Sequence, residues 1–143
     1  MHIPKLLAAA LLVSMATAHA APRPYTIIDH STDAVMTKDS ALAIWKSQVD
    51  AKTMARLIKL YPATKWGFIS QVEGGFTTDK VCVITARAMM VPRITGGRLV
   101  FKPSQTATAF GAQAGATLDQ CKELAVTKLK EAVASVGSSL VKS

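Results

Sequence analysis

The chain has 143 residues with 17 basic and 9 acidic side chains, a net charge of +8, and half of its residues are hydrophobic. This length suits one domain with a real core and is too short for two. The basic excess favours acidic partners, such as an acidic protein or an anionic envelope polymer, although it also helps to keep a protein soluble.

The first twenty residues are typical of an export signal. Lys5 is the only charged side chain of the head, Leu6–Met15 is an apolar run, and Ala18-His19-Ala20 is the pattern that signal peptidase cleaves. The run is too short to span a bilayer, and nothing after Ala20 resembles a transmembrane segment. We therefore expect cleavage after Ala20, without a lipid anchor, and a periplasmic or secreted protein of 123 residues with a net charge of +7.

The two cysteines, Cys82 and Cys121, predict a disulfide. An even number of cysteines in an exported protein is typical of disulfide bonding, and their separation excludes a CxxC redox motif. Two cysteines alone also make a poor zinc site, because zinc prefers four ligands. The expected bond closes a loop of about 40 residues.

The N-terminal part of the expected mature chain predicts an irregular arm followed by a helix. Ala21–Lys38 begins with two closely spaced prolines and continues into a polar, turn-prone stretch, with a short extended piece at Tyr25–Ile28. Asp39 or Ser40 is a suitable helix cap, and Pro62 ends the helical pattern.

Two apolar stripes in this helix predict a bend or a break near Asp50. Leu42, Trp45 and Val49 fall on one face at helical spacing. A second stripe, rotated by about a third of a turn, consists of Met54, Leu57, Ile58 and Tyr61. A straight helix would not bury both stripes, and Asp50 is able to cap a new start.

The middle of the chain predicts three strands in an antiparallel meander. The strands are expected at Trp66–Val72, Lys80–Val91 and Arg98–Lys102, with turns at Gly74-Gly75 and Gly96-Gly97. Glycines between consecutive strands favour direct hairpin connections.

The last third of the chain predicts a loop and then the most regular helix of the sequence. Ser104–Ala116 is small and polar, so we expect a loop, although its alternation leaves a short extra strand open. Thr117 and Gln120 form a capping box. The apolar stripe of the helix consists of Leu118, Cys121, Ala125, Leu129, Ala132, Val133 and Val136. Gly137-Ser138-Ser139 is expected to fray its end.

These patterns combine in one architecture. Cys121 lies on the apolar stripe of the last helix, and Cys82 shares the small-residue face of the central strand with Ala86 and Ala88. A disulfide between the cysteines would clamp the helix across the sheet. We therefore expect one α+β domain at 39–143, a two-layer sandwich of the broken N-terminal helix, the three-stranded antiparallel meander and the C-terminal helix.

The expected mature chain offers few catalytic groups. His30 is its only histidine, and a nucleophile–histidine–acid set with Ser31 and Asp29 or Asp33 exists in composition only, because such sets are assembled from different elements. No pair of carboxylates stands out as a general acid and base, and no glycine pair resembles a phosphate-binding loop. Packing explains the methionines better than copper binding does. We expect no enzymatic activity, no metal and no cofactor.

The outer face of the sheet, opposite the helices, is the best candidate for a binding site. The candidate partner-binding residues, which strand alternation places on this side, are Arg87, Met89, Arg98, Val100 and Lys102. Arginines among exposed apolar side chains are typical of protein-binding surfaces. The alternative is that the N-terminal arm or a second subunit covers this face.

Three functions are open from the sequence. The first is an exported, non-enzymatic binding protein of inhibitor, immunity or accessory type, which docks an acidic macromolecular partner through the open sheet face. The second is a structural or assembly accessory protein of the cell envelope, acting as a homodimer joined through an edge strand or the open sheet. A small hydrolase ranks third, and nucleic acid is disfavoured as a partner because the basic residues lack aromatic platforms.

Overall fold

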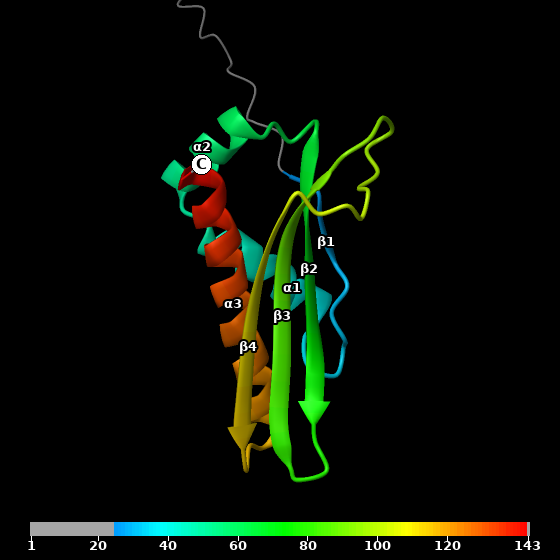
Figure 1. Cartoon of the computed structure of the whole chain (residues 1–143), viewed down its shortest axis with the longest axis vertical. Helices are drawn as coiled ribbons and strands as arrows, with labels where there is room; N and C mark the ends of the chain where they lie inside the picture. The colour runs from blue at the N-terminus through cyan, green and yellow to red at the C-terminus, as the bar shows by residue number, and fades with distance from the viewer. Residues whose placement is uncertain (1–24, 143) are drawn as a thin grey trace, which may run out of the picture.

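A four-stranded sheet carries three helices on one of its faces in the computed structural model, which describes residues 25–142 (Figure 1). The elements are β1 (Ile27–Asp29), α1 (Lys38–Gln48), α2 (Ala51–Leu60), β2 (Trp66–Phe76), β3 (Val81–Pro92), β4 (Gln105–Ala114) and α3 (Leu118–Lys142). The expected α+β class is confirmed. The expected signal peptide and its cleavage after Ala20 lie outside the described residues.

The sheet is mixed, because a parallel strand joins an antiparallel meander. The strand order is β1-β2-β3-β4, with β1 parallel to β2 and the other neighbours antiparallel. The register places Ile28, Ile69, Met89 and Thr106 in one row across the four strands. β1 lies within 21–38, the segment for which an irregular arm with a short extended piece is predicted.

The expected third strand at Arg98–Lys102 is wrong, because Gln105–Ala114 takes its place beside β3 as β4. Small and polar residues predict a loop there, yet all ten pair with β3. Side-chain size does not decide the pairing, because the ladder uses backbone groups and the edge of β3 accepts one partner at each position.

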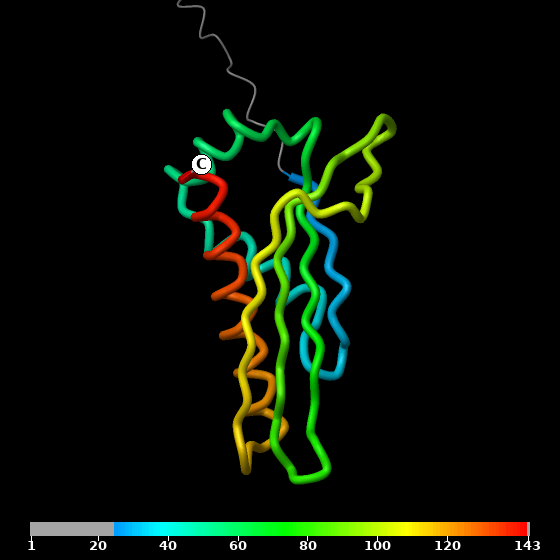
Figure 2. Tube along the Cα trace, in the orientation of Figure 1, coloured from blue at the N-terminus to red at the C-terminus, as the bar shows by residue number. Residues whose placement is uncertain are grey.

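Residues 93–104, which we call the excursion, leave the sheet between β3 and β4. Figure 2 shows them projecting from the upper end of the sheet. The expected turn at Gly96-Gly97 is present, but the two sides of this turn pair only through a single β-bridge, between Arg93 and Leu99. The turn expected at Gly74-Gly75 is wrong, because β2 continues through both glycines to Phe76.

The N-terminal helix is broken at Asp50, as the two apolar stripes predict. Asp50 is the N-cap of α2: its Oδ1 accepts from the Thr53 backbone N–H at 2.9 Å, and its Oδ2 accepts from the Thr53 hydroxyl at 2.7 Å. These hydrogen bonds stabilise the charged carboxylate and lower the pKa of Asp50. α1 has Thr37 as its N-cap, so the expected cap at Asp39 or Ser40 is wrong.

The C-terminal helix begins at the expected capping box. The Thr117 backbone N–H donates to Gln120 Oε1 at 2.8 Å, and the Gln120 N–H donates to Thr117 Oγ1 at 3.2 Å. The helix continues to Lys142, so the expected frayed end is wrong. The Cys82–Cys121 disulfide joins β3 to the first turn of α3 with a Cα separation of 5.7 Å, and it confirms the expected clamp. The buried residues of α3 are Cys121, Ala125, Leu129, Ala132, Val133, Val136, Gly137 and Leu140.

Candidate functional site

The outer sheet face is the part of the sheet that points away from the helices below the excursion. Its residues are Gln71, Glu73, Val83, Thr85, Arg87, Thr108, Phe110 and Ala112. Phe110 is 65 % exposed, and no large hydrophobic side chain among residues 25–142 is more exposed. The register sets Thr108 directly opposite Arg87 on β3, and Phe110 lies two residues further along β4. The face therefore combines an exposed aromatic ring with an exposed cation.

The excursion covers the upper end of the same face. Leu99 packs on a small cluster of Met89, Ile69 and Val91, and Met89 is only 3 % exposed. Gly67 permits this close approach, because a Cβ at that position would lie 2.5 Å from Leu99 Cδ2. Met89 is therefore a packing residue beneath the excursion.

Three of the sequence-predicted candidates lie on the excursion itself. Arg98, Val100 and Lys102 are exposed, but they do not lie on a strand beside Arg87, because β4 occupies that position. Arg93 holds the base of the excursion by donating to two backbone carbonyls, and its side chain is half-buried. Arg87 is thus the one predicted candidate that lies on the outer sheet face.

Sequence reasoning missed the contribution of β4 to this face. Thr108 and Phe110 are functional candidates only once Gln105–Ala114 is known to be a strand. The alternation of Thr106, Thr108 and Phe110, which leaves a short extra strand open in the sequence, is the signal that points to them, because residues two apart share one face of a strand.

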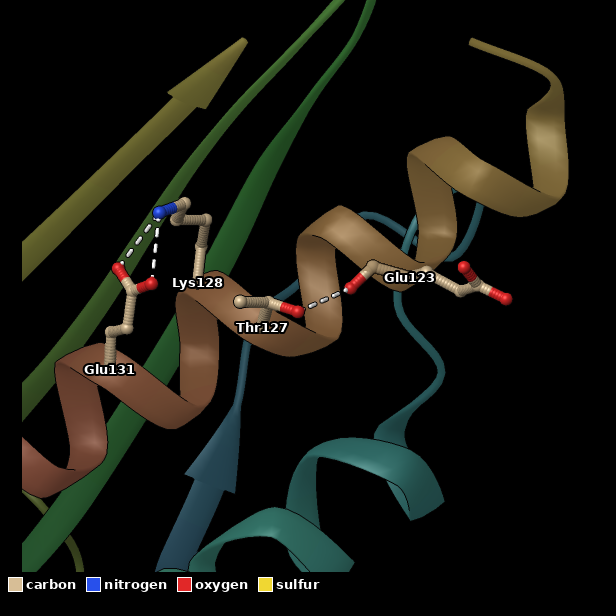
Figure 3. Close-up of polar contacts among 4 residues, drawn as sticks. All are labelled: Glu123, Thr127, Lys128 and Glu131. Atoms are coloured by element: carbon tan, nitrogen blue, oxygen red, sulfur yellow. Dashed lines mark hydrogen bonds and ion pairs between the residues drawn. The ribbon is translucent and has the colours of Figure 1, made fainter. Parts of the chain in front are cut away.

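The charged side chains of the outer sheet face are Arg87 and Glu73. The side chain of Arg87 makes no hydrogen bond or ion pair with any residue of the described part of the chain, whereas Glu73 accepts a hydrogen bond from Gln71 Nε2 at 2.6 Å. The ion pair found among the described residues lies on α3, where Lys128 Nζ is 2.9 Å from Glu131 Oε2 (Figure 3). The basic side chains within residues 25–142 are therefore mostly without an ion-pair partner.

The serines near His30 have a structural role. Asp29 Oδ1 accepts from the Ser31 hydroxyl at 2.8 Å and from the Ser70 hydroxyl at 2.6 Å. Ser31 Oγ in turn accepts from the Val72 backbone N–H at 2.9 Å, so the cluster joins β1 to β2. His30 is exposed and hydrogen-bonds through its backbone N–H. These contacts do not form a nucleophile–histidine–acid set.

Neither a metal site nor a membrane-spanning helix is found among the described residues. Residues 25–142 contain no group of three or more His, Cys, Asp or Glu side chains arranged to hold a metal ion. No helix in that range is both long and apolar enough to cross a membrane.

No protein-family model matches this chain, and no curated protein sequence matches it either. Among solved structures, it is similar to a dodecamer of a PelC variant from Paraburkholderia phytofirmans, at 12 % identity and a TM-score of 0.44, over 83 % of this chain and 92 % of that chain. It is also similar to a minor lipoprotein from Acinetobacter baumannii, at 11 % identity and a TM-score of 0.39, over 83 % and 91 % of the two chains. These similarities are too weak to assign any property of either protein to this chain.

Proposed function

We propose that this chain is an exported, non-enzymatic binding protein that docks an acidic macromolecular partner through the outer sheet face. The observation that carries the proposal is Phe110, which is 65 % exposed on the strand next to the unpaired Arg87. Aromatic and arginine side chains supply much of the binding energy in protein interfaces. The Cys82–Cys121 disulfide supports export, since such bonds persist in oxidising compartments.

The charge of the chain supports an acidic partner. Arg87 lies on the outer sheet face, and the exposed Arg98 and Lys102 lie on the excursion at its upper end. An arginine bonds a carboxylate or phosphate in bidentate geometry, so Arg87 is expected to matter more than Lys102. The overall positive charge adds attraction over a range of about 8–10 Å in physiological salt.

Site-directed photo-cross-linking in the producing cells tests this proposal. A photoreactive phenylalanine at position 110 is expected to capture one acidic macromolecule, and Arg87→Glu is expected to reduce that product by about tenfold or more. Lys130 is exposed on α3 and provides both controls, as a second cross-linking position and as the charge-matched variant Lys130→Glu. The proposal is wrong if positions 110 and 130 give the same products, or if Arg87→Glu changes nothing.

The edge of β4 favours a second candidate, an accessory protein of the envelope that assembles with itself. β4 is an edge strand of ten residues without a charge or a proline, and such edges pair readily with another chain. This candidate predicts a dimer in sedimentation equilibrium that the exposed edge variant Ala112→Lys dissociates. This second candidate function is wrong if the chain stays monomeric at high concentration.

A further inference from the structure

An apolar cavity of about 340 Å³ lies on the helical side of the sheet, away from the outer sheet face. It is bounded by α1, α2, the C-terminal half of α3 and the adjoining parts of β1 and β2. The lining residues are Tyr25, Ile27, Trp45, Lys46, Val49, Met54, Leu57, Ile58, Phe68, Val136 and Gly137. The break at Asp50 separates α1 from α2, so the two helices form two walls of the cavity instead of one continuous packing surface.

The aliphatic walls of this cavity are incompletely covered. Ile27, Val49, Met54 and Ile58 are only half-buried, although all four pack against the core. Gly137 lies in the C-terminal half of α3, and a Cβ at that position would meet no heavy atom within 4 Å. The absence of a side chain there therefore leaves space in the cavity that an ordinary residue would fill.

The polar groups of the cavity are donors. Trp45 is 3 % exposed, and its indole Nε1 is the buried side-chain polar atom that lacks a hydrogen-bond partner within the described residues. Lys46, the next residue of α1, is exposed and is the charged residue of the lining. The indole N–H is covered by protein atoms, so Lys46 is the donor that a ligand in the cavity can reach directly.

The remaining polar group of the lining is already satisfied. The Tyr25 hydroxyl donates to the Tyr61 carbonyl, which ties the segment before β1 to the C-cap of α2. Burial raises the pKa of Tyr25 to about 12, so this hydroxyl stays neutral and remains a donor. The lining therefore contributes no negative charge.

The helices around the cavity are basic. Residues 38–60, which include α1 and α2, contain five basic and two acidic side chains. Both acids lie at helix starts: Asp39 is in the first turn of α1, and Asp50 accepts hydrogen bonds as the N-cap of α2. The net charge of this segment is 5 − 2 = +3, which favours an anionic ligand.

We propose that this cavity binds a free single-chain amphiphile with an aliphatic chain and an acidic head, of the fatty-acid class. The aliphatic and aromatic walls would bury the chain, and the Lys46 ammonium would meet the carboxylate. The volume lies at the lower end of the range of about 300–1,000 Å³ for small-molecule sites, which suits one chain better than two.

Calorimetric titration of the native protein with decanoate, below its micelle concentration, tests this inference. We expect saturable one-to-one binding, and affinity about tenfold weaker for Lys46→Gln or for decyltrimethylammonium, which has a cationic head. Gly137→Leu is expected to abolish binding while raising the melting temperature, because it fills the cavity and replaces a helical glycine. Ser135→Leu, exposed on the same helix, is the matched control and should bind normally.

The smaller change Gly137→Ala keeps the test valid if the leucine variant fails to fold. It should fold, melt higher than the native protein and bind decanoate less tightly. The inference is wrong if the native protein does not bind decanoate, if Gly137→Leu folds and binds as well as the native protein, or if both head groups bind equally. Binding to phosphatidylglycerol vesicles that depends on Gly137 would instead identify a two-chain lipid and overturn the single-chain assignment.

Discussion

Removing the Cys82–Cys121 disulfide should lower the free energy of unfolding by about 4 kcal/mol. The bond closes a loop with a sequence separation of 39 residues, for which the chain-entropy model gives about 4 kcal/mol at 25 °C. Both cysteines are completely buried, so the double variant Cys82→Ala/Cys121→Ala loses in addition the packing of two sulfur atoms, roughly 1 kcal/mol at most. The main effect lies in the unfolded chain, which gains conformational freedom when the bond is absent.

Guanidinium denaturation followed by circular dichroism measures this difference. The oxidised native protein, the reduced native protein and the double alanine variant should have the same folded spectrum, and the last two should unfold at similarly lower denaturant. The slope of the transition should increase slightly without the bond, since the unfolded chain exposes more surface. A loss below about 1 kcal/mol would refute the entropic reasoning, and two reactive thiols in the native exported protein would refute the bond itself.

Two further perturbations test the capping residue and the excursion. The folded-state pKa of Asp50 is lowered, so its contribution to stability is present above the unfolded pKa of about 4 and is lost as the pH falls below that value. The urea midpoint of the native protein should therefore fall more between about pH 6 and pH 3 than that of Asp50→Asn, which caps without titrating; parallel curves would contradict this. Leu99→Ser should lower the free energy of unfolding by about 1–2 kcal/mol and speed tryptic cleavage after Arg98, and unchanged cleavage would show that Leu99 does not hold the excursion.

The features of the fold that sequence could predict depend on local signals. The break at Asp50 follows from two apolar stripes that no straight helix can bury, together with a residue that caps well. The start of α3 follows from Thr117 and Gln120, whose hydrogen bonds need only their own turn. The disulfide follows from cysteine count, since a chain with two cysteines has one possible intramolecular pairing.

The features that sequence could not predict depend on competition between distant segments. Arg98–Lys102 and Gln105–Ala114 both alternate, and only the three-dimensional pairing decides which one lies against β3. The sequence predicts a short extended piece at Tyr25–Ile28, but it does not predict that β1 pairs in parallel with β2, because no turn links the two strands. The pairing of β3 with β4 also brings Phe110 close to Arg87. The sequence therefore predicts that β3 contributes to the candidate face, but it names Arg98–Lys102 and not β4 as the neighbouring strand.

The cavity was beyond prediction for the same reason. Its walls come from five elements, and Gly137, which the sequence pattern assigns to a frayed end, lies buried within a continuous helix. The hydrophobic periodicity of a single segment does not indicate how much space remains between several packed segments.

The position of the disulfide gives the molecule one end that is fixed covalently and one end that is held by noncovalent contacts, such as the hydrogen bond from Gln105 Nε2 to Ser139 Oγ. Cys121 and Gly137 lie sixteen residues apart on α3, a separation of about 24 Å along the helix axis. The bond therefore fixes the sheet to the start of α3, at the end of the helix away from the cavity. We expect reduction of the bond to leave the residues that line the cavity in place, so that decanoate binding does not depend on the redox state of the cysteines.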